Sequence, residues 1–209
     1  NKCCFTKPSF ERIMKKKRKV AILIPAHNEQ EVLGATIRSL LLIVPKEDIF
    51  IVENGSNDQT LEIAKGYSPN VIHFPENKGK VGALNQGLER FNLAKRYEYI
   101  MPIDADTIVS PDFFKEALPT LEKDKDRQIA CAVGKVVGRN HKWITTYRLW
   151  EYEVSQTIHK AAQAVINAII VCPGPSTIFR SEVLGKTKVP TGTLTEDMDL
   201  TFLIHRQRL

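Results

Sequence analysis

Four short apolar runs, each followed by a helix-like segment, constrain the fold of this chain more than any other feature. The runs are rich in β-branched and aromatic residues and cover residues 20–24, 49–53, 71–74 and 97–103. Because their apolar residues are continuous, each run predicts a strand that is buried on both faces. Strands that alternate with helices form βαβ units, so we expect an α/β fold with a mainly parallel central sheet flanked by helices.

The segments between these runs carry helix signals. Residues 29–43 place their leucines and isoleucines on one face of a helix. Asp58 has the position of an N-cap for a helix that starts at residue 60. Glycines open a helix predicted over residues 77–96. Ser110 and the proline after it predict the start of another helix.

The second half of the chain is less regular. Residues 129–137 predict a strand, and residues 143–170 predict one or two helices with an aromatic start. Residues 172–184 combine a chain breaker, a short strand and a turn. An acidic cluster opens a helix within residues 191–209. We find no internal repeat or linker, which favours a single folded domain.

The positive charge of the chain is concentrated at its N-terminus. The net charge is +6, and residues 1–19 contain eight basic residues and one acidic residue, so the rest of the chain carries −1. We therefore predict a basic arm over residues 1–19 and one domain over residues 20–209. The arm could contact anionic lipid or remain a solvated extension. No aromatic platform or nucleic-acid-binding motif is present, so we expect no nucleic acid partner.

The four cysteines, Cys3, Cys4, Cys131 and Cys172, have no CxxC spacing and no companion histidine pattern. This arrangement favours reduced thiols in a cytosolic environment over a disulfide framework or a zinc site. The apolar runs are far shorter than the roughly 18 residues that a membrane-spanning helix needs.

Polar residues follow all four predicted strands. They occupy residues 25–29, 53–58, 76–80 and 104–106. In open α/β sheets, ligands bind outside the carboxyl ends of the strands. Four separate loops therefore converge on one edge of the sheet, and this edge is the predicted ligand site.

Asp104 and Asp106 end the fourth strand one residue apart, so their side chains point to the same side and repel each other. A divalent cation between them would relieve this repulsion. Carboxylate oxygens suit Mg²⁺ or Mn²⁺, which keeps waters and takes further ligands from a substrate diphosphate. The simpler alternative is that one carboxylate caps a turn and the other is solvated.

Two further motifs can be interpreted in two ways. Lys80 lies at a glycine-entered helix start, which suits an anion, although this motif taken alone favours a glycine turn with surface lysines. Thr195, Glu196 and Asp197 place carboxylates at another helix start. They could supply a general base, or they could complement the helix dipole.

Six segments of the chain, taken in order, resemble the family 2 glycosyltransferases with a GT-A fold. The segments are PAHNE, ENGSND, NKGKVGALNQG, DAD, PGPS and TED. The resemblance is strongest to the membrane-embedded group that includes hyaluronan, chitin, cellulose and poly-N-acetylglucosamine synthases, and it covers residues 20–207. It implies a Rossmann-like nucleotide-binding half followed by an acceptor-side half.

The resemblance also implies a role for each matching residue. The donor-binding residues would be Pro25, Ala26, Glu29, Glu53, Asn54, Lys80, Asp104 and Ala105. Asp104 and Asp106 would hold Mn²⁺ or Mg²⁺, and Gly174, Pro175 and Ser176 would form the wall where donor sugar and acceptor meet. Asp197 would be the general base, and Glu196 would raise its basicity or cap the helix.

The implied reaction is metal-dependent and inverting. A sugar would move from a UDP-sugar, with UDP-N-acetylglucosamine or UDP-glucose as the best candidates, to a hydroxyl of a growing glycan. The alternatives are a single transfer to a polyprenyl phosphate, a sugar nucleotidyltransferase, and a noncatalytic module recruited to membranes by the basic arm. The loop over residues 25–31 lacks the glycine-rich, arginine-bearing character of nucleotidyltransferases, which disfavours that alternative.

The chain departs from the family pattern in two places. Glu53 stands where the family has an aspartate that accepts the uracil N–H, so the base would shift or Asn54 would take over. A Q-x-x-R-W segment and the transmembrane helices that follow it are not in the sequence. We therefore expect a soluble fragment of a longer protein that works at the cytoplasmic face of a membrane. The aromatic residues of the segment 143–152 could stack on an acceptor glycan, but we expect them to pack on the sheet or on a membrane segment that is not in the sequence.

Overall fold

The computed structural model describes residues 17–137, 143–165, 169–190 and 195–207. Most of the predicted basic arm, including Cys3 and Cys4, lies outside these residues. Arg18 and Lys19, which we assigned to the arm, begin the first strand.

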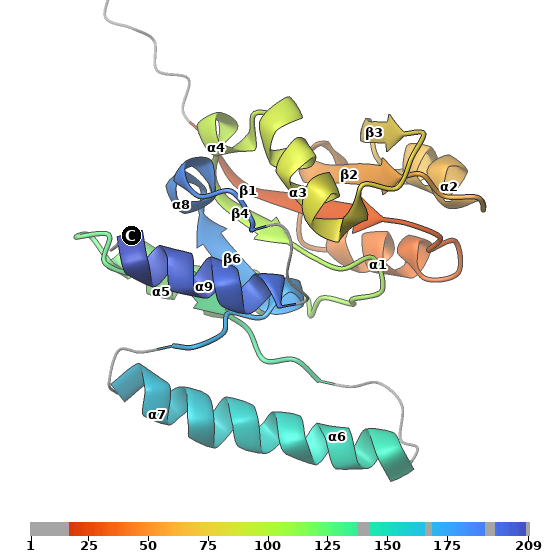
Figure 1. The fold of residues 1–209 in the computed structure, drawn as a ribbon. Coiled ribbons are helices and arrows are strands. Elements are labelled where there is room, and N and C mark those ends of the chain that lie inside the picture. The colour runs from red at the N-terminus through yellow and green to blue at the C-terminus, as the bar shows by residue number, and fades with distance from the viewer. Residues whose placement is uncertain (1–16, 138–142, 166–168, 191–194, 208–209) are drawn as a thin grey trace, which may run out of the picture.

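The centre of the molecule is a mixed sheet in which the described residues form six strands, in the order β3-β2-β1-β4-β6-β5 (Figure 1). The strands are β1 (Arg18–Ala26), β2 (Ile49–Asn54), β3 (Asn70–Phe74), β4 (Tyr97–Pro102), β5 (Cys131–Val133) and β6 (Thr177–Arg180). The first four are parallel, as predicted, whereas β6 runs antiparallel to both β4 and β5. Strand β5 covers only Cys131–Val133, so the strand predicted over residues 129–137 is shorter than expected.

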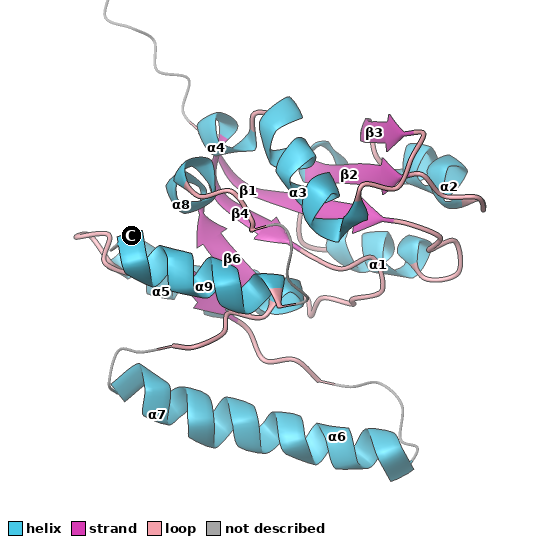
Figure 2. Cartoon of the chain, in the orientation of Figure 1, coloured by secondary structure: helices cyan, strands magenta, loops and turns pink. Residues whose placement is uncertain are grey.

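Helices cover both faces of the sheet (Figure 2). One face packs against α1 (Leu33–Leu40), α2 (Thr60–Tyr67) and α5 (Phe113–Lys123). The other face packs against α3 (Gly79–Arg90), α4 (Leu93–Arg96), α8 (Ser181–Lys186) and α9 (Glu196–Gln207). Single turns of 3₁₀ helix cover Lys46–Asp48 and Gly174–Ser176.

Strand β1 shows why the apolar runs are continuous. Ile22 and Ile24 belong to the core on one face, and Ala21 and Leu23 belong to the core on the other. All four side chains are fully buried. Burying one leucine or isoleucine side chain stabilises a fold by about 1.5–3 kcal/mol, so both faces of this strand contribute to stability.

Local signals set several helix boundaries. The Asp58 carboxylate accepts the backbone N–H of Thr60 at 3.0 Å, but the N-cap residue of α2 is Gln59, so the predicted cap lies one residue too early. The single helix predicted over residues 77–96 is wrong, because Asn92 adopts a left-handed conformation with φ 53° and separates α3 from α4. The turn predicted after β6 is instead the short helix α8.

A long helical segment stands apart from the sheet (Figure 1). It consists of α6 (Trp143–Val154), a π-helical turn (Ser155–His159) and α7 (Lys160–Val165). Gln156 faces the body of the protein, since its side chain accepts the N–H of Val136 at 2.7 Å and donates to the carbonyl of the same residue at 3.0 Å.

The aromatic residues of this segment do not pack on the sheet, so that alternative is wrong, whereas packing on a further segment stays a prediction. Tyr147, Trp150 and Tyr152 are 56%, 62% and 46% exposed, and the side chain of Trp143 lies outside the described residues. The contact with the body of the protein is made by polar side chains such as Gln156. In the described part of the chain, no helix combines the length and apolar character needed to cross a membrane.

Candidate functional site

The loops after β2 and β3 are joined by Asn54, at the end of β2. Its side chain donates to Asn77 Oδ1 at 2.8 Å and to the Gly79 carbonyl at 3.2 Å, and it accepts the Lys78 N–H at 2.9 Å. Gly55 follows with φ 71°, and a Cβ there would lie 2.7 Å from the Asn77 nitrogen. Glycine is therefore required for the close approach that positions the start of α3.

The loops after β1 and β2 are joined in a similar way. The Asn28 N–H donates to Ser56 Oγ at 3.0 Å, and Asn28 Oδ1 accepts the Asn57 N–H at 2.9 Å. The Glu29 N–H donates to Thr60 Oγ1 at 2.8 Å. Three strand ends thus form one connected edge, as the sequence predicted.

Glu53 is fully buried at this edge. One carboxylate oxygen accepts the Ser56 N–H at 2.6 Å, and the other pairs with His73 Nδ1. Burial alone would raise the pKa of Glu53, but the hydrogen bonds from Ser56 and His73 lower it overall. The side chain of Asn54 is also fully engaged in the contacts described above. His73 was not predicted as a partner of Glu53, because only the register of β2 and β3 places the two residues opposite each other.

The end of β4 carries the paired aspartates. The Thr36 hydroxyl, from α1, donates to the Ala105 carbonyl at 2.7 Å and fixes the turn between them. Asp104 is partly buried and Asp106 is exposed. Burial raises the pKa of Glu29, and the charges of Asp106 and Asp104 raise it further. The structure therefore brings these three predicted site carboxylates into one region of negative potential.

Lys80 connects this region to the start of α9. Its ammonium lies 2.8 Å from Asp104 Oδ1 and 3.4 Å from Glu196 Oε1. Burial lowers the pKa of Lys80, but the carboxylates of Asp104, Glu196 and Asp197 raise it overall. The lysine therefore remains a cation between two segments that are distant in sequence.

Asp197 is held against Gly174, the first residue of the predicted wall between donor sugar and acceptor. The Gly174 N–H donates to Asp197 Oδ2 at 2.8 Å. Burial raises the pKa of Asp197. The Gly174 N–H and Lys80 oppose this effect, Glu196 and Asp104 add to it, and the pKa remains above its usual value. A carboxylate with a raised pKa is a better proton acceptor than an ordinary aspartate.

A small cavity of about 20 Å³ joins residues from the two halves of the chain. The predicted site residues that line it are Pro25, Lys80, Asp104, Gly174, Glu196 and Asp197. This volume holds about one water molecule, because the Lys80 ion pairs occupy most of the space.

The other predicted residues lie around this cavity. Ala26 and Ala105 are buried behind the edge of the sheet. Pro175 and Ser176 continue the wall from Gly174, and Ser176 Oγ has no hydrogen-bond partner among the described residues. Asp106, Glu29, Glu53 and Asn54 lie along the edge of the sheet, outside the cavity.

Within the described residues, no three histidine, cysteine, aspartate or glutamate side chains are arranged to hold a metal ion by themselves. A metal in this region would therefore need ligands from water or from a bound substrate as well as from the protein. This is the coordination that Mg²⁺ adopts in most phosphate-binding sites.

Comparisons with known proteins agree with the fold described above. Residues 21–187 match the model of the family described as glycosyl transferase family 2. The chain is 28% identical over 193 residues to the poly-beta-1,6-N-acetyl-D-glucosamine synthases of Staphylococcus epidermidis and Staphylococcus aureus. These alignments cover 89% of this chain and 45% of each synthase, so the chain spans less than half the length of these curated relatives.

Solved structures show the same fold. TarS residues 1–349 from S. aureus, in complex with UDP-GlcNAc, matches with a TM-score of 0.60 and 19% identity, over 88% of this chain and 52% of that one. Glucosyl-3-phosphoglycerate synthase from Mycobacterium tuberculosis, in complex with Mg²⁺ and UDP, matches with a TM-score of 0.59 and 19% identity, over 93% and 67%. These likenesses confirm the predicted GT-A-type fold. Because the family model covers most of the chain, this protein belongs to glycosyltransferase family 2.

Proposed function

We propose that this chain is the catalytic domain of a glycosyltransferase that moves a sugar from a UDP-sugar to a hydroxyl of a growing glycan, with inversion. The observation that carries the proposal is the Lys80 bridge. It joins Asp104, at the predicted donor side, to Glu196, next to the predicted base. A single displacement requires the donor-binding residues and the general base to lie next to each other, and the Lys80 bridge brings these two segments together.

The residues at the end of β4 fit a divalent metal. Asp104 and Asp106 offer carboxylate oxygens, the ligand type that Mg²⁺ and Mn²⁺ prefer. The charges of both side chains raise the pKa of Glu29, so a cation here would relieve an existing repulsion. When bound, the metal would supply positive charge to the diphosphate of the leaving UDP.

Lys80 has a second part in the proposal. Its ammonium now neutralises Asp104 and Glu196. A bound metal would take over the charge of Asp104, and Lys80 would then turn toward the diphosphate at the N-terminus of α3. A helix N-terminus and a lysine together favour an anion.

Asp197 is the proposed general base. Its pKa is raised, yet it remains far below that of a sugar hydroxyl, so proton transfer must accompany bond formation. The Gly174 N–H fixes one carboxylate oxygen and leaves the other for the acceptor. Such positioned proton transfer contributes a factor of about 10² to 10⁴ in rate.

The proposed donor pocket continues along the edge of the sheet to Glu53 and Asn54. The length of the glutamate side chain allows Glu53 to reach both Ser56 and His73. In the proposal the uracil base binds beside Glu53 and Asn54, whose buried side chains hold the surrounding loops in place. Pro25, Ala26, Glu29 and Ala105 complete the donor pocket.

The proposed donors are UDP-N-acetylglucosamine and UDP-glucose. The first is favoured by the relatives named poly-beta-1,6-N-acetyl-D-glucosamine synthase. The proposed acceptor is a glycan hydroxyl, and the wall formed by Gly174, Pro175 and Ser176 lies beside Asp197 where such an acceptor would bind. A polyprenyl phosphate is the second candidate. We propose that the whole protein works at the cytoplasmic face of a membrane, which the basic arm would help to bind.

Calorimetry with UDP tests the donor site. We expect UDP to bind in the presence of Mn²⁺ and to bind poorly in EDTA. Asp106→Ala should abolish the metal dependence. The matched control is Asp112→Ala, because Asp112 is an exposed aspartate that pairs with Lys115. Metal-independent binding, or no binding by a folded sample, contradicts the proposal.

Turnover tests the transfer itself. The full-length gene product should hydrolyse or transfer sugar from one member of a panel of UDP-sugars, and Asp197→Asn should remove this activity while UDP still binds. A noncatalytic module would release no UDP from any member of the panel.

A further inference from the structure

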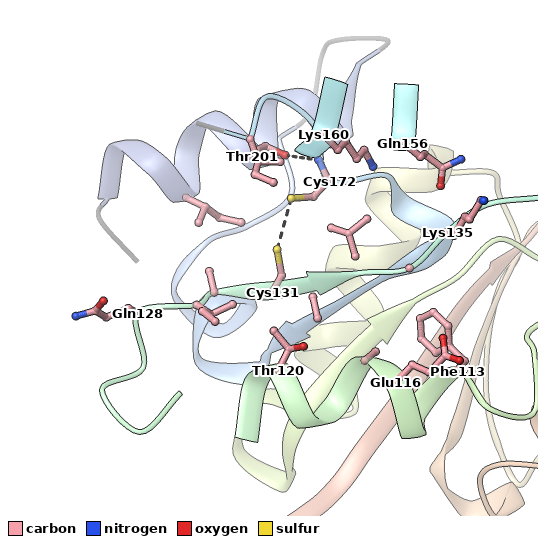
Figure 3. Close-up of a pocket in the computed structure, with 18 of the residues that line it drawn as sticks. Phe113, Glu116, Thr120, Gln128, Cys131, Lys135, Gln156, Lys160, Cys172 and Thr201 are labelled. Atoms are coloured by element: carbon pink, nitrogen blue, oxygen red, sulfur yellow. Dashed lines mark hydrogen bonds between the residues drawn. The ribbon is translucent and has the colours of Figure 1, made fainter. Parts of the chain in front are cut away.

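A second and much larger cavity is lined in part by Thr201, Ile204 and His205 of α9. Its volume is about 1180 Å³, and α5, β5, α7 and α9 contribute to its walls (Figure 3). Asp104, Lys80, Asp197 and the other predicted site residues do not line it. Two thiols, Cys131 and Cys172, face each other at its wall.

The geometry of the two thiols is close to that of a disulfide. Cys131 lies on the edge strand β5, and Cys172 lies in the segment that precedes the 3₁₀ turn Gly174–Ser176. Their sulfur atoms are 3.5 Å apart, and both cysteines are reduced. A disulfide needs a sulfur–sulfur distance of about 2.05 Å. The two sulfurs must therefore approach each other further, by movement on the edge strand or in the segment that carries Cys172, before a disulfide can form.

The two sulfurs have different protonation tendencies. The hydrogen bond from Cys131, together with Thr201 and Lys160, lowers the pKa of Cys172 to about 7. The same sulfur–sulfur hydrogen bond and burial raise the pKa of Cys131 well above its usual value. Of the two, Cys172 is therefore the thiol that loses its proton more readily.

Lys160 is the charged neighbour of the two thiols, and burial lowers its own pKa. Its ammonium is buried and has no hydrogen-bond partner among the described residues, and it lines the same cavity. The charge of Lys160 acts to lower the pKa of both thiols. A buried cation beside a thiolate is the environment of a reactive cysteine.

We propose that Cys131 and Cys172 form an oxidation site, at which a hydroperoxide that enters the large cavity converts the two thiols into a disulfide. The Cys172 thiolate attacks one peroxide oxygen, the O–O bond breaks, and the leaving hydroxide takes a proton to become water. Cys172 is then a sulfenic acid. The Cys131 sulfur attacks the Cys172 sulfur, the S–O bond breaks, and a second water leaves with the proton of Cys131. Two thiols and hydrogen peroxide thus give one disulfide and two waters.

The pair lies directly behind the candidate site. The Cys172 N–H donates to Thr201 Oγ1 at 3.0 Å, and the Thr201 hydroxyl donates to the Asp197 carbonyl at 2.7 Å. Gly174, two residues after Cys172, holds the Asp197 carboxylate. A disulfide would therefore displace the segment that positions Asp197. This consequence rests on the proposed function, whereas the thiol chemistry does not.

The test uses the full chain with Cys3→Ser and Cys4→Ser, so that only the two facing thiols remain. After hydrogen peroxide treatment, we expect a loss of two hydrogen masses, a peptide that joins Cys131 to Cys172, and reversal by dithiothreitol. In a further Cys131→Ser variant, Cys172 should instead accumulate as a sulfenic acid that dimedone traps. Circular dichroism of each variant checks that it is folded.

Lys160→Gln tests the part played by the buried cation. The rate of disulfide formation at pH 7 should fall several-fold, because less thiolate is present. Lys135→Gln is the matched control, since Lys135 lines the same cavity but pairs with Glu153, and it should leave the rate unchanged. The proposal is overturned if the folded chain keeps both thiols reduced under peroxide. Disulfides formed only between molecules would also overturn it.

Discussion

Asp197 shows how single contacts tune a candidate catalytic group. Burial raises its pKa, and the neighbouring Glu196 carboxylate raises it further, while Gly174 and Lys80 act in the opposite direction. The sequence suggested that Glu196 either raises the basicity of Asp197 or caps the helix. The 3.4 Å contact with Lys80 shows that Glu196 also shares, with Asp104, the cation whose charge acts on Asp197.

Glu196→Gln should therefore lower the pKa of Asp197 toward the usual value of about 3.9. The substitution removes a negative charge and leaves Lys80 closer to its remaining carboxylates. Carbon-13 NMR titration of the Asp197 carboxyl measures the effect without any assay of activity. The base would then be ionised to a lower pH, so the acid limb of the pH–rate profile should move down as well.

The control for this titration is Glu182→Gln, because Glu182 pairs with Arg127 and is not among the groups that shift Asp197. A pKa of Asp197 that stays constant or rises in Glu196→Gln would show that the Glu196 charge does not act on Asp197.

The close approach of the loops after β2 and β3 depends on Gly55. Gly55→Ala would combine a φ of 71° with a Cβ that lies 2.7 Å from the Asn77 nitrogen. We expect a destabilisation of about 1–3 kcal/mol, measured as the free energy of unfolding in urea. Gly66→Ala is the control, because nothing lies within 4 Å of its added Cβ, and it should stabilise the helix by about 0.5–1 kcal/mol. Equal effects of the two substitutions would contradict this account of the turn.

At the scale of elements, the first half of the chain could be predicted well from its sequence. Continuous apolar runs and N-caps are local signals, and β1 to β4 lie where these signals placed them. The second half was predicted less well, because its elements depend on contacts between distant residues. Strand β5 is short because its pairing with β6 ends at Val133, which no local pattern in residues 129–137 indicates.

Arg180 is one such long-range contact. Its side chain on β6 donates to the carbonyls of Ile129 at 2.8 Å and Leu121 at 2.7 Å, and it pairs with Asp124 at 3.0 Å. These contacts connect the end of α5 and the start of β5 to β6. The residues next to Arg180 in the sequence predict only a strand that ends in a turn.

We expect Arg180→Leu to lower the midpoint of thermal unfolding by several degrees, because it leaves buried acceptors without a donor. Arg127→Leu is the control, since Arg127 is exposed and pairs with Glu182 on the surface, and its effect should be much smaller. Similar midpoints for the two variants would mean that Arg180 does not organise this part of the sheet.

At the scale of the whole molecule, the candidate site is built from segments that the sequence separates widely. The sequence predicted that four strand ends meet at one edge, and that prediction is confirmed. The position of α9 depended on the family resemblance, because no local signal indicates that Asp197 approaches Lys80. The Glu53–His73 pair was missed for the same reason, since it depends on the register of β2 and β3.

The helices α6 and α7 were predicted from the sequence, but their separation from the sheet was not. Their aromatic residues suggested an apolar face against the sheet, yet polar side chains such as Gln156 make that contact. Aromatic content alone does not specify which face of a helix is buried, because a few side-chain hydrogen bonds to strand ends can decide the orientation.

Paramagnetic NMR with Mn²⁺ and UDP tests the central claim most directly. The account predicts that the amide signals of residues 104–106, Lys80 and residues 196–197 broaden most strongly, and that Mg²⁺ in place of Mn²⁺ leaves them sharp. The signals of Ser181–Lys186, in α8, should change least. Broadening centred on any other part of the molecule, or confined to residues 104–106 without Lys80 and Asp197, would contradict a shared metal and diphosphate site.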